Sequence, residues 1–234
     1  MPPLLILLLL GVCAGVASTR NDCSLPLPNS SSPEDSLDSI RHEMLTMRDG
    51  VRLSTITTTP FRTNETHFTT VIDRSPYGFF ATELFSQLLV LLGYAGVSQD
   101  MRGTCNSEGS YSLWHSDSND AYDTMEWIVA QPWSNGKILS IGASADGIAS
   151  FLMPLADPVS PPWLQAQFII WATAEAHDCF YPGGAYRHGL VDGWIKGTLP
   201  TQADGLMQQV RSHEGWDAWW EPVTAAGKPI VFQV

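Results

Sequence analysis

The stretch that most constrains the fold runs from Lys137 to Gly147 and reads Lys-Ile-Leu-Ser-Ile-Gly-Ala-Ser-Ala-Asp-Gly. A short apolar run, too brief for a helix, leads into small residues, and apolar residues then recur at helical spacing from Ile148 to Leu155. The pattern predicts a strand, a sharp turn and a helix. A serine on such a turn, here Ser144, projects its hydroxyl above the carboxyl edge of a sheet, as in a nucleophile elbow. The usual elbow has its second glycine two residues after the serine, whereas here Asp146 holds that position, so an ordinary strand-to-helix connection is the competing interpretation.

The elements before this stretch alternate between strand and helix. Met44 to Met47 and Val51 to Thr59 flank Asp49-Gly50, a dipeptide that tolerates positive φ at a turn, so they predict a β-hairpin. Further strands are expected at 68–73 and 94–99, and helices at 81–93 and from about 117 to 131. Such alternation is typical of a mostly parallel sheet with helices on its faces, so we predict an α/β fold.

The predicted division of the chain has five parts. They are a signal peptide at 1–18, a leader at 19–43, an α/β core at 44–157, a helical cap at 158–222 and the start of the next core strand at 223–234. A cap is expected because proline and glycine separate short apolar pieces after residue 157. Six tryptophans crowd this region: Trp163, Trp171, Trp194, Trp216, Trp219 and Trp220. They either pack short helices together or form an apolar wall over Ser144.

Composition and the N-terminus limit the partners. A formal net charge of −12 and a pI near 4.7 argue against a surface that neutralises nucleic acid or an anionic membrane. Leu4 to Val16 is almost wholly apolar and is followed by small residues, as in a secretory signal. Because no Lys or Arg precedes this segment, a buried segment or an uncleaved anchor is the alternative interpretation. Glycosylation sequons at Asn29 and Asn64 agree with secretion. We expect an extracellular protein without membrane attachment after signal removal, and leave assembly as a homo-oligomer open.

Cysteine usage predicts at most one disulfide. Removing the signal also removes Cys13, which leaves Cys23, Cys105 and Cys179. Cys105 and Cys179 are the candidate pair, because both fall in segments expected on the active face; separate buried thiols are the alternative. The chain has no CxxC pair and no HExxH motif, so the sequence predicts neither a metal site nor a cofactor.

Several segments, taken in order, resemble one family. They are Arg74-Ser-Pro-Tyr77, Gln99-Asp-Met-Arg-Gly103, Ser107-Glu-Gly109, Asp120-Ala-Tyr-Asp-Thr-Met-Glu-Trp127, Gln131-Pro-Trp-Ser-Asn-Gly-Lys137, the elbow, and Tyr181-Pro-Gly-Gly-Ala-Tyr186. From about residue 44 to 234 the chain resembles the Xaa-Pro dipeptidyl-peptidase and cocaine-esterase group of α/β-hydrolases. The resemblance implies an α/β-hydrolase fold and small ester, amide or peptide substrates. It further implies that Ser144 is the acylating nucleophile, and that the Tyr77 hydroxyl and the backbone N–H of Ala145 bind the oxyanion.

Two departures from the family pattern bear on activity. Ala145 stands where the family usually has an aromatic residue. The family's catalytic acid lies in a Gly-Trp-x-Asp segment after the strand that 229–234 resembles, and its histidine follows later, so we expect a hydrolase fold truncated at its C-terminus. Seven histidines and aspartates after Ser144 fall in the expected cap, where packing or surface roles are expected: His177, His188, His213, Asp178, Asp192, Asp204 and Asp217.

Two functional hypotheses follow from these observations. The first is a secreted serine hydrolase that cleaves acyl esters or amides, with Xaa-Pro peptides as one candidate class, through an acyl-enzyme on Ser144. The second is a catalytically inactive truncated homologue or a secreted binding protein, because a serine hydroxyl is a poor nucleophile without a base and an orienting carboxylate.

Overall fold

The computed structural model describes residue 23 and residues 40–60, 63–78, 88–156 and 161–228. The expected signal peptide, most of the leader, Asn29, most of the helix expected at 81–93 and the strand expected at 229–234 lie outside these residues. Asn64 is described and is exposed.

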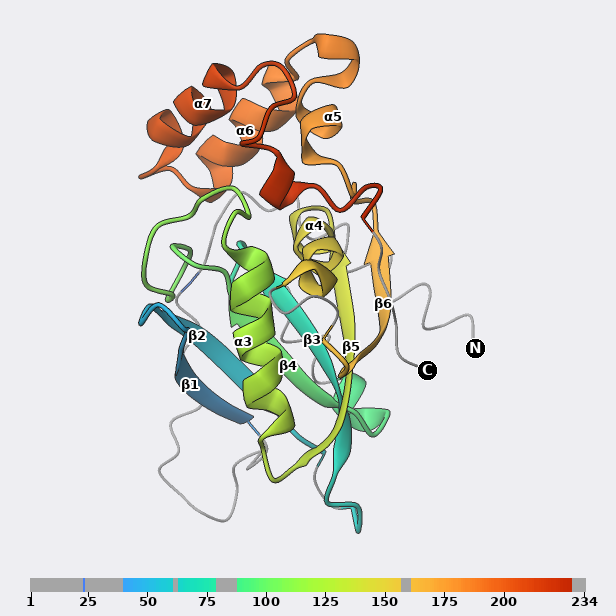
Figure 1. The fold of residues 1–234 in the computed structure, drawn as a ribbon. Helices are drawn as coiled ribbons and strands as arrows, with labels where there is room; N and C mark the ends of the chain where they lie inside the picture. Colours follow the sequence, from blue (N-terminus) through green and yellow to red (C-terminus); the bar gives the residue numbers. More distant parts are fainter. Residues whose placement is uncertain (1–22, 24–39, 61–62, 79–87, 157–160, 229–234) are drawn as a thin grey trace.

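A six-stranded mixed sheet forms the centre of the molecule, in the order β1-β2-β4-β3-β5-β6 (Figure 1). Its strands are β1 (Ile40–Thr46), β2 (Arg52–Thr58), β3 (Phe68–Ser75), β4 (Ala95–Asp100), β5 (Ser134–Ala143) and β6 (Leu164–Ile170). β1 and β2 form the predicted antiparallel hairpin, and Gly50 in its turn has a φ of 88°. β2 and β4 are antiparallel, whereas β3, β4, β5 and β6 run parallel. The predicted α/β alternation is therefore confirmed.

The prediction that the cap begins at residue 158 is wrong. β6 lies inside that range and pairs with β5 from Ile138 opposite Leu164 to Ala143 opposite Ile170. Nearby prolines and flanking tryptophans made this segment look like part of the cap, yet only long-range pairing with β5 decides that it joins the sheet. At the other end, β1 begins at Ile40, inside the expected leader.

Helices cover one face of the sheet and its carboxyl edge (Figure 1). On the face lie α3 (Asp117–Val129) and α4 (Ala145–Leu152), the latter followed by the 3-10 turn η1 (Met153–Leu155). Above the carboxyl ends of the parallel strands lie α5 (Ala176–Phe180), α6 (His188–Thr198) and α7 (Ala203–Ser212), with the 3-10 turns η2 (Pro182–Gly184) and η3 (Glu221–Val223). These last elements are the cap.

The two larger of three apolar clusters in the described residues hold the layers together. One lies between α3 and the sheet and includes Ile72, Met125 and Ile138, which are fully buried. The larger joins α4 and the loop before α3 to the cap, and contains Trp114, Ile148 and Ile195 among others. Because the cap shares a core with the elbow helix, it is packed onto the site that the elbow carries.

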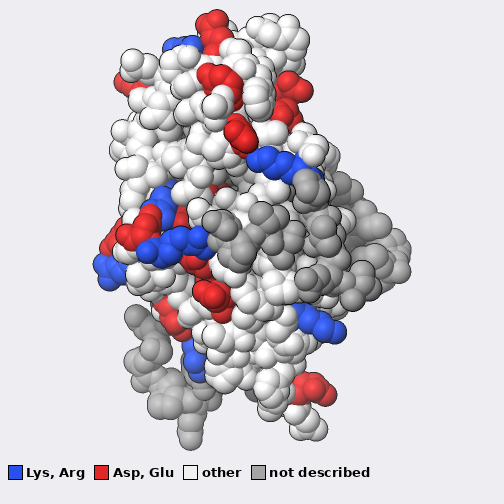
Figure 2. Space-filling view, in the orientation of Figure 1, with Lys and Arg blue, Asp and Glu red and all other residues white. Residues whose placement is uncertain are grey.

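Several charged residues on the described surface form opposite-sign pairs. Arg48 pairs with Asp123, Arg52 with Glu108, and Arg102 with both Asp49 and Asp120. Figure 2 shows acidic and basic side chains next to one another on one face, without a continuous basic area among its described residues. In the part of the chain that the structure describes, no helix has the length and apolar character needed to span a membrane.

Candidate active site

The turn between β5 and α4 has the backbone geometry of a nucleophile elbow. Ser144 has a φ of 58° and a ψ of −119°, a conformation that non-glycine residues rarely adopt. A Cβ on Gly142 would lie 2.3 Å from the backbone oxygen of Asp146, and one on Gly147 would lie 2.5 Å from the Cβ of Ala172. Both glycines are therefore required by close approach. Gly147, three residues after the serine, permits the packing that places α4 against the segment following β6.

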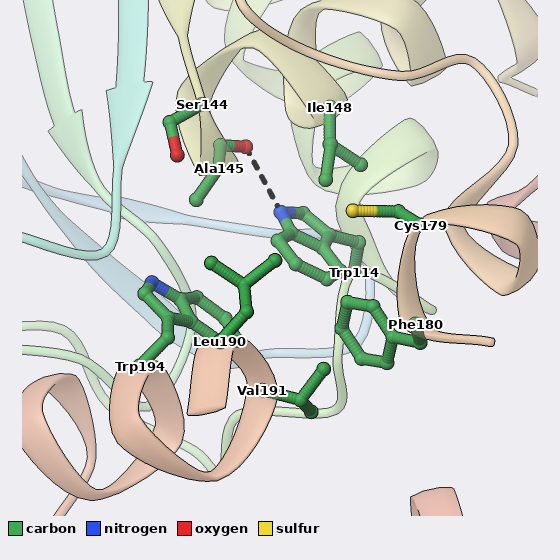
Figure 3. A pocket seen from close by; sticks show the side chains of 9 residues that line it. All are labelled: Trp114, Ser144, Ala145, Ile148, Cys179, Phe180, Leu190, Val191 and Trp194. Carbon is green, nitrogen blue, oxygen red and sulfur yellow. Dashed lines mark hydrogen bonds between the residues drawn. The ribbon is translucent and has the colours of Figure 1, made fainter. Parts of the chain in front are cut away.

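The elbow places Ser144 at the mouth of an apolar cavity of about 70 Å³ (Figure 3). Ser144 is exposed, whereas the neighbouring Ala145 is buried. The wall consists of residues from the loop before α3, the elbow helix and the cap: Trp114, Ala145, Ile148, Cys179, Phe180, Leu190, Val191 and Trp194. An uncharged, apolar group attached to the serine oxygen would find a matching surface here.

Tyr77, on the loop that follows β3, lies beside the serine. Its hydroxyl accepts a hydrogen bond from Nε1 of Trp194 at 3.0 Å, and it interacts electrostatically with the Ser144 side chain and the backbone of Ala145. Burial, followed by the negative charge of Asp146, raises the pKa of Tyr77 to about 12. The phenol is therefore protonated at neutral pH and can donate to an oxyanion.

Two groups that can donate hydrogen bonds thus lie beside Ser144, an arrangement suited to acyl transfer. The Ala145 N–H is at the amino end of α4, and Tyr77 lies on the loop after the neighbouring strand β3. Donors that are held in place before reaction stabilise the charge that develops on a carbonyl oxygen under attack. The structure brings together Ser144, Tyr77 and Ala145, the three residues that the resemblance implied.

Sequence reasoning missed two carboxyl groups behind the elbow, the partly buried Asp73 and the buried Asp146. Burial raises the pKa of Asp73 to about 7, and burial together with the charge of Asp73 raises the pKa of Asp146 well above its usual value. The Ser75 hydroxyl oxygen accepts a hydrogen bond from the backbone N–H of Tyr77, and the Ser75 hydroxyl partly offsets the rise in the Asp146 pKa. Ser75 thus lies between Asp146 and the backbone of Tyr77. The aspartate in place of the usual elbow glycine was the available signal.

Sequence reasoning also missed Trp114, because the loop from 100 to 117 read as a long polar connection. The side chain is buried, and its Nε1 donates to the backbone oxygen of Ala145 at 3.1 Å. The nearby apolar residues Tyr111 and Leu113 are buried as well. An apolar group of three within a polar loop was the signal that could have revealed it.

The disulfide prediction is wrong. Cys105 bonds to Cys23, across a sequence separation of 82, while Cys179 is free and lines the cavity. Asn106 donates a hydrogen bond to the backbone oxygen of Cys23, which helps to hold the leader residue against this loop. No local pattern shows that the leader returns to the β4–α3 loop, so the sequence could not select this pair.

The three histidines that follow Ser144 have recorded partners within the cap. His177 contacts the backbone oxygen of Glu214 through Nε2 at 2.9 Å, His188 lies 3.7 Å from Asp192, and His213 lies 2.8 Å from Asp217. His213 also stacks on Trp219. Within the described ranges, no cluster of three or more histidine, cysteine, aspartate or glutamate side chains could hold a metal ion.

Comparison with known proteins agrees with this geometry. Residues 49–229 match the model of the X-Pro dipeptidyl-peptidase family, S15. The cocaine esterase of Rhodococcus sp. (strain MB1 Bresler) is 32% identical over 159 residues, which cover 64% of this chain and 27% of that protein. An aminopeptidase from a marine sediment archaeon, Thaumarchaeota archaeon, has a TM-score of 0.66 at 21% identity, covering 91% of this chain and 45% of its own.

A selenomethionine-labelled alpha-amino acid ester hydrolase likewise has a TM-score of 0.66, at 23% identity, covering 86% of this chain and 43% of its own. These structural likenesses establish the α/β-hydrolase fold. The chain spans less than half the length of each of these relatives.

Proposed function

Because the chain belongs to the X-Pro dipeptidyl-peptidase (S15) family of hydrolases, we propose that it carries the nucleophile and oxyanion hole of a secreted serine hydrolase. The proposed reaction is cleavage of acyl ester or amide bonds through an acyl-enzyme on Ser144, with Xaa-Pro peptides as one candidate class of substrate. The observation that carries the proposal is an exposed serine at positive φ, beside two oxyanion donors and an apolar cavity.

In the proposed reaction, the Ser144 oxygen attacks the carbonyl carbon while a general base accepts the hydroxyl proton. Negative charge then develops on the carbonyl oxygen, to which the Tyr77 O–H and the Ala145 N–H donate. Collapse of the tetrahedral intermediate breaks the C–O or C–N bond, and the leaving group takes the proton from the base. Attack by water on the acyl-serine releases the acid and restores the hydroxyl.

The wall of the cavity favours an uncharged apolar acyl group over a charged one. Apart from Ser144 its lining side chains are apolar, and Phe180, Leu190 and Val191 come from the cap. Burying a charge against such a wall without a partner would be costly. Ester substrates with apolar acyl groups are therefore the first to test.

The first experiment separates a reactive serine from an inert one. A fluorophosphonate probe should label wild-type protein at Ser144, located by peptide mass spectrometry, and should not label Ser144→Ala. Hydrolysis of p-nitrophenyl acetate, p-nitrophenyl benzoate and an Ala-Pro anilide then distinguishes ester from dipeptide substrates. Absence of label on the wild-type serine would overturn the proposal and favour an inactive homologue or a binding protein.

The role of Tyr77 as an oxyanion donor is tested by a separate variant. Tyr77→Phe keeps the ring but removes the hydroxyl, and kcat should fall by about 10²–10³-fold, as for loss of one donor elsewhere. An unchanged kcat would exclude Tyr77 from the mechanism.

The source of the general base can be tested with the same probe. His213 and Asp217 form the shortest histidine–carboxylate contact in the described cap, at 2.8 Å. Because His213 faces Asp217 and stacks on Trp219, we expect it to have a packing role, in which case His213→Gln should be labelled as fast as wild type. A large loss of labelling in His213→Gln would instead assign the base to this pair.

Secretion is part of the proposal as well. The disulfide between Cys23 and Cys105 supports it, because such bonds persist mainly in oxidising compartments. When the full chain is expressed in a secreting host, the protein should appear in the medium, and thiol titration should find one free thiol, that of Cys179. Protein retained in the cell with Cys23 and Cys105 reduced would contradict secretion.

A further inference from the structure

Two stacked tryptophans make hydrogen bonds to both halves of the oxyanion hole. Trp114 lies on the loop between β4 and α3, and Trp194 lies on α6 of the cap. Their rings stack with centroids 5.2 Å apart and an interplanar angle of 6°. Trp194 Nε1 donates to the Tyr77 hydroxyl at 3.0 Å, and Trp114 Nε1 donates to the Ala145 backbone oxygen at 3.1 Å. Figure 3 shows both indoles beside the serine turn.

The bond from Trp194 restricts where the Tyr77 proton can point. A tyrosine hydroxyl has one proton to donate and two lone pairs that accept. One lone pair accepts from Nε1 of Trp194 at 3.0 Å, so the proton is kept away from the side of the indole. The hydroxyl proton is thereby left to an acceptor on another side of the tyrosine.

The bond from Trp114 acts on the other donor. The Ala145 carbonyl belongs to the first turn of α4, and its own residue supplies the backbone N–H beside Ser144. An additional donor on this carbonyl restricts the orientation of the turn. Holding it reduces the reorganisation needed when the oxyanion forms.

The backbone of Trp114 is itself in an unusual conformation. Leu113 and Trp114 have φ values of 50° and 67°, which cost energy for bulky side chains. The conformation is held by packing, since Trp114 contacts the rings of Tyr111, Phe180 and Trp194 edge-on or stacked. Its result is that a long loop delivers a buried indole N–H to the elbow.

We propose that Trp194 and Trp114 are positioning residues for the oxyanion hole, Trp194 acting through the Tyr77 hydroxyl and Trp114 through the Ala145 backbone. This inference rests on the proposed hydrolase function. It makes the cap part of the catalytic apparatus, because α6 must be docked for the tyrosine proton to be aimed. A cap that only shaped the cavity would contribute to substrate affinity alone.

A double-mutant cycle on the full chain tests the route of each effect. Trp194→Phe preserves an aromatic ring but removes the N–H, and kcat for a p-nitrophenyl ester should fall by about 10-fold, less than the loss of the whole donor. In a Tyr77→Phe background the same change should alter kcat by less than about twofold, because the hydroxyl it acts on is gone. Trp114→Phe should lower kcat by a similar factor in both backgrounds, since it acts through Ala145.

The control is Trp216→Phe, at an exposed tryptophan in the segment after α7. It should leave kcat and KM unchanged. A loss of packing in Trp194→Phe would lower activity equally with or without the Tyr77 hydroxyl. Equal losses in the two backgrounds would therefore overturn the positioning role of Trp194.

A spectroscopic measurement keeps the test independent of turnover. The chain has nine tryptophans, whose indole N–H signals can be observed in 15N-labelled protein and assigned by the peak lost in each Trp→Phe variant. In Tyr77→Phe the Trp194 signal should move and the Trp216 signal should not. If the wild type hydrolyses no ester, the proposed function fails. The Trp194 signal then still tests whether Trp194 is hydrogen-bonded to Tyr77, and an unmoved signal in Tyr77→Phe would overturn the inference.

Discussion

Arg74 is a fully buried charged residue, and removing it should test how the loop that carries Tyr77 is held. Its side chain is 0% exposed and lies three residues before Tyr77. Nη1 donates to the carboxylate of Asp117 at 2.6 Å and to its backbone oxygen at 2.9 Å, and Nε donates to Gln99 at 2.8 Å. Arg74 thus ties the end of β3 to β4 and to the start of α3.

The perturbation is Arg74→Met, which keeps a long apolar stem and removes the charge. Breaking a buried ion pair from one side costs about 3–5 kcal/mol, because the remaining charge is left without its partner. Burial already raises the pKa of Asp117, so this carboxyl can take up a proton when the arginine is gone. We therefore expect a loss at the lower end, about 3 kcal/mol of unfolding free energy.

The matched control is Arg52→Met. Arg52 pairs with Glu108, but both side chains are about half exposed. Exposed pairs contribute about 0–1 kcal/mol. The two substitutions are chemically identical, so the difference between them isolates burial.

The assay is urea unfolding at pH 7, followed by tryptophan fluorescence, with an unchanged slope required before midpoints are compared. Adding Asp117→Asn to Arg74→Met should recover part of the loss, because the isolated carboxylate is removed. An Arg74→Met loss below about 1 kcal/mol, or one equal to that of Arg52→Met, would refute the reasoning.

Two further predictions concern the elbow. Gly147→Ala places a Cβ 2.5 Å from a neighbouring side chain, so it should lower the free energy of unfolding by about 1–3 kcal/mol and abolish most of the probe labelling of Ser144. The control is Gly205→Ala in α7, where nothing lies within 4 Å of the added Cβ, and it should be neutral or slightly stabilising. Equal urea midpoints for the two variants would contradict the steric argument. Because burial raises the pKa of Asp73 from 3.8 to about 7, the folded chain holds a proton that the unfolded chain releases, and stability should fall as pH rises from about 4 through 7. Asp73→Asn should reduce that slope in urea midpoints measured from pH 5 to 8, and an unchanged slope would argue against a buried, protonated carboxyl.

Features set by neighbours along the chain were predictable. The hairpin at Asp49-Gly50, the strand before Ser144 and the helix after it follow from turn chemistry and from apolar spacing. The resemblance placed Ser144, Tyr77 and Ala145 in one site, and the structure brings these three together. The glycine at position 147 was visible in the sequence, but only the close contact with Ala172 showed that a side chain cannot replace it there.

Features set by distant parts of the chain were not predictable. β6 joins the sheet because β5 offers it a parallel edge, and Cys105 bonds to Cys23 because the leader returns to the β4–α3 loop. Likewise, Trp114 and Trp194 meet only when the loop and the cap pack together. Local sequence thus determined which segments became strand, turn and helix, since these depend on contacts a few residues apart. Only tertiary packing decided which donors and carboxyls surround the serine, since hydrogen bonds and burial depend on partners far away in the chain.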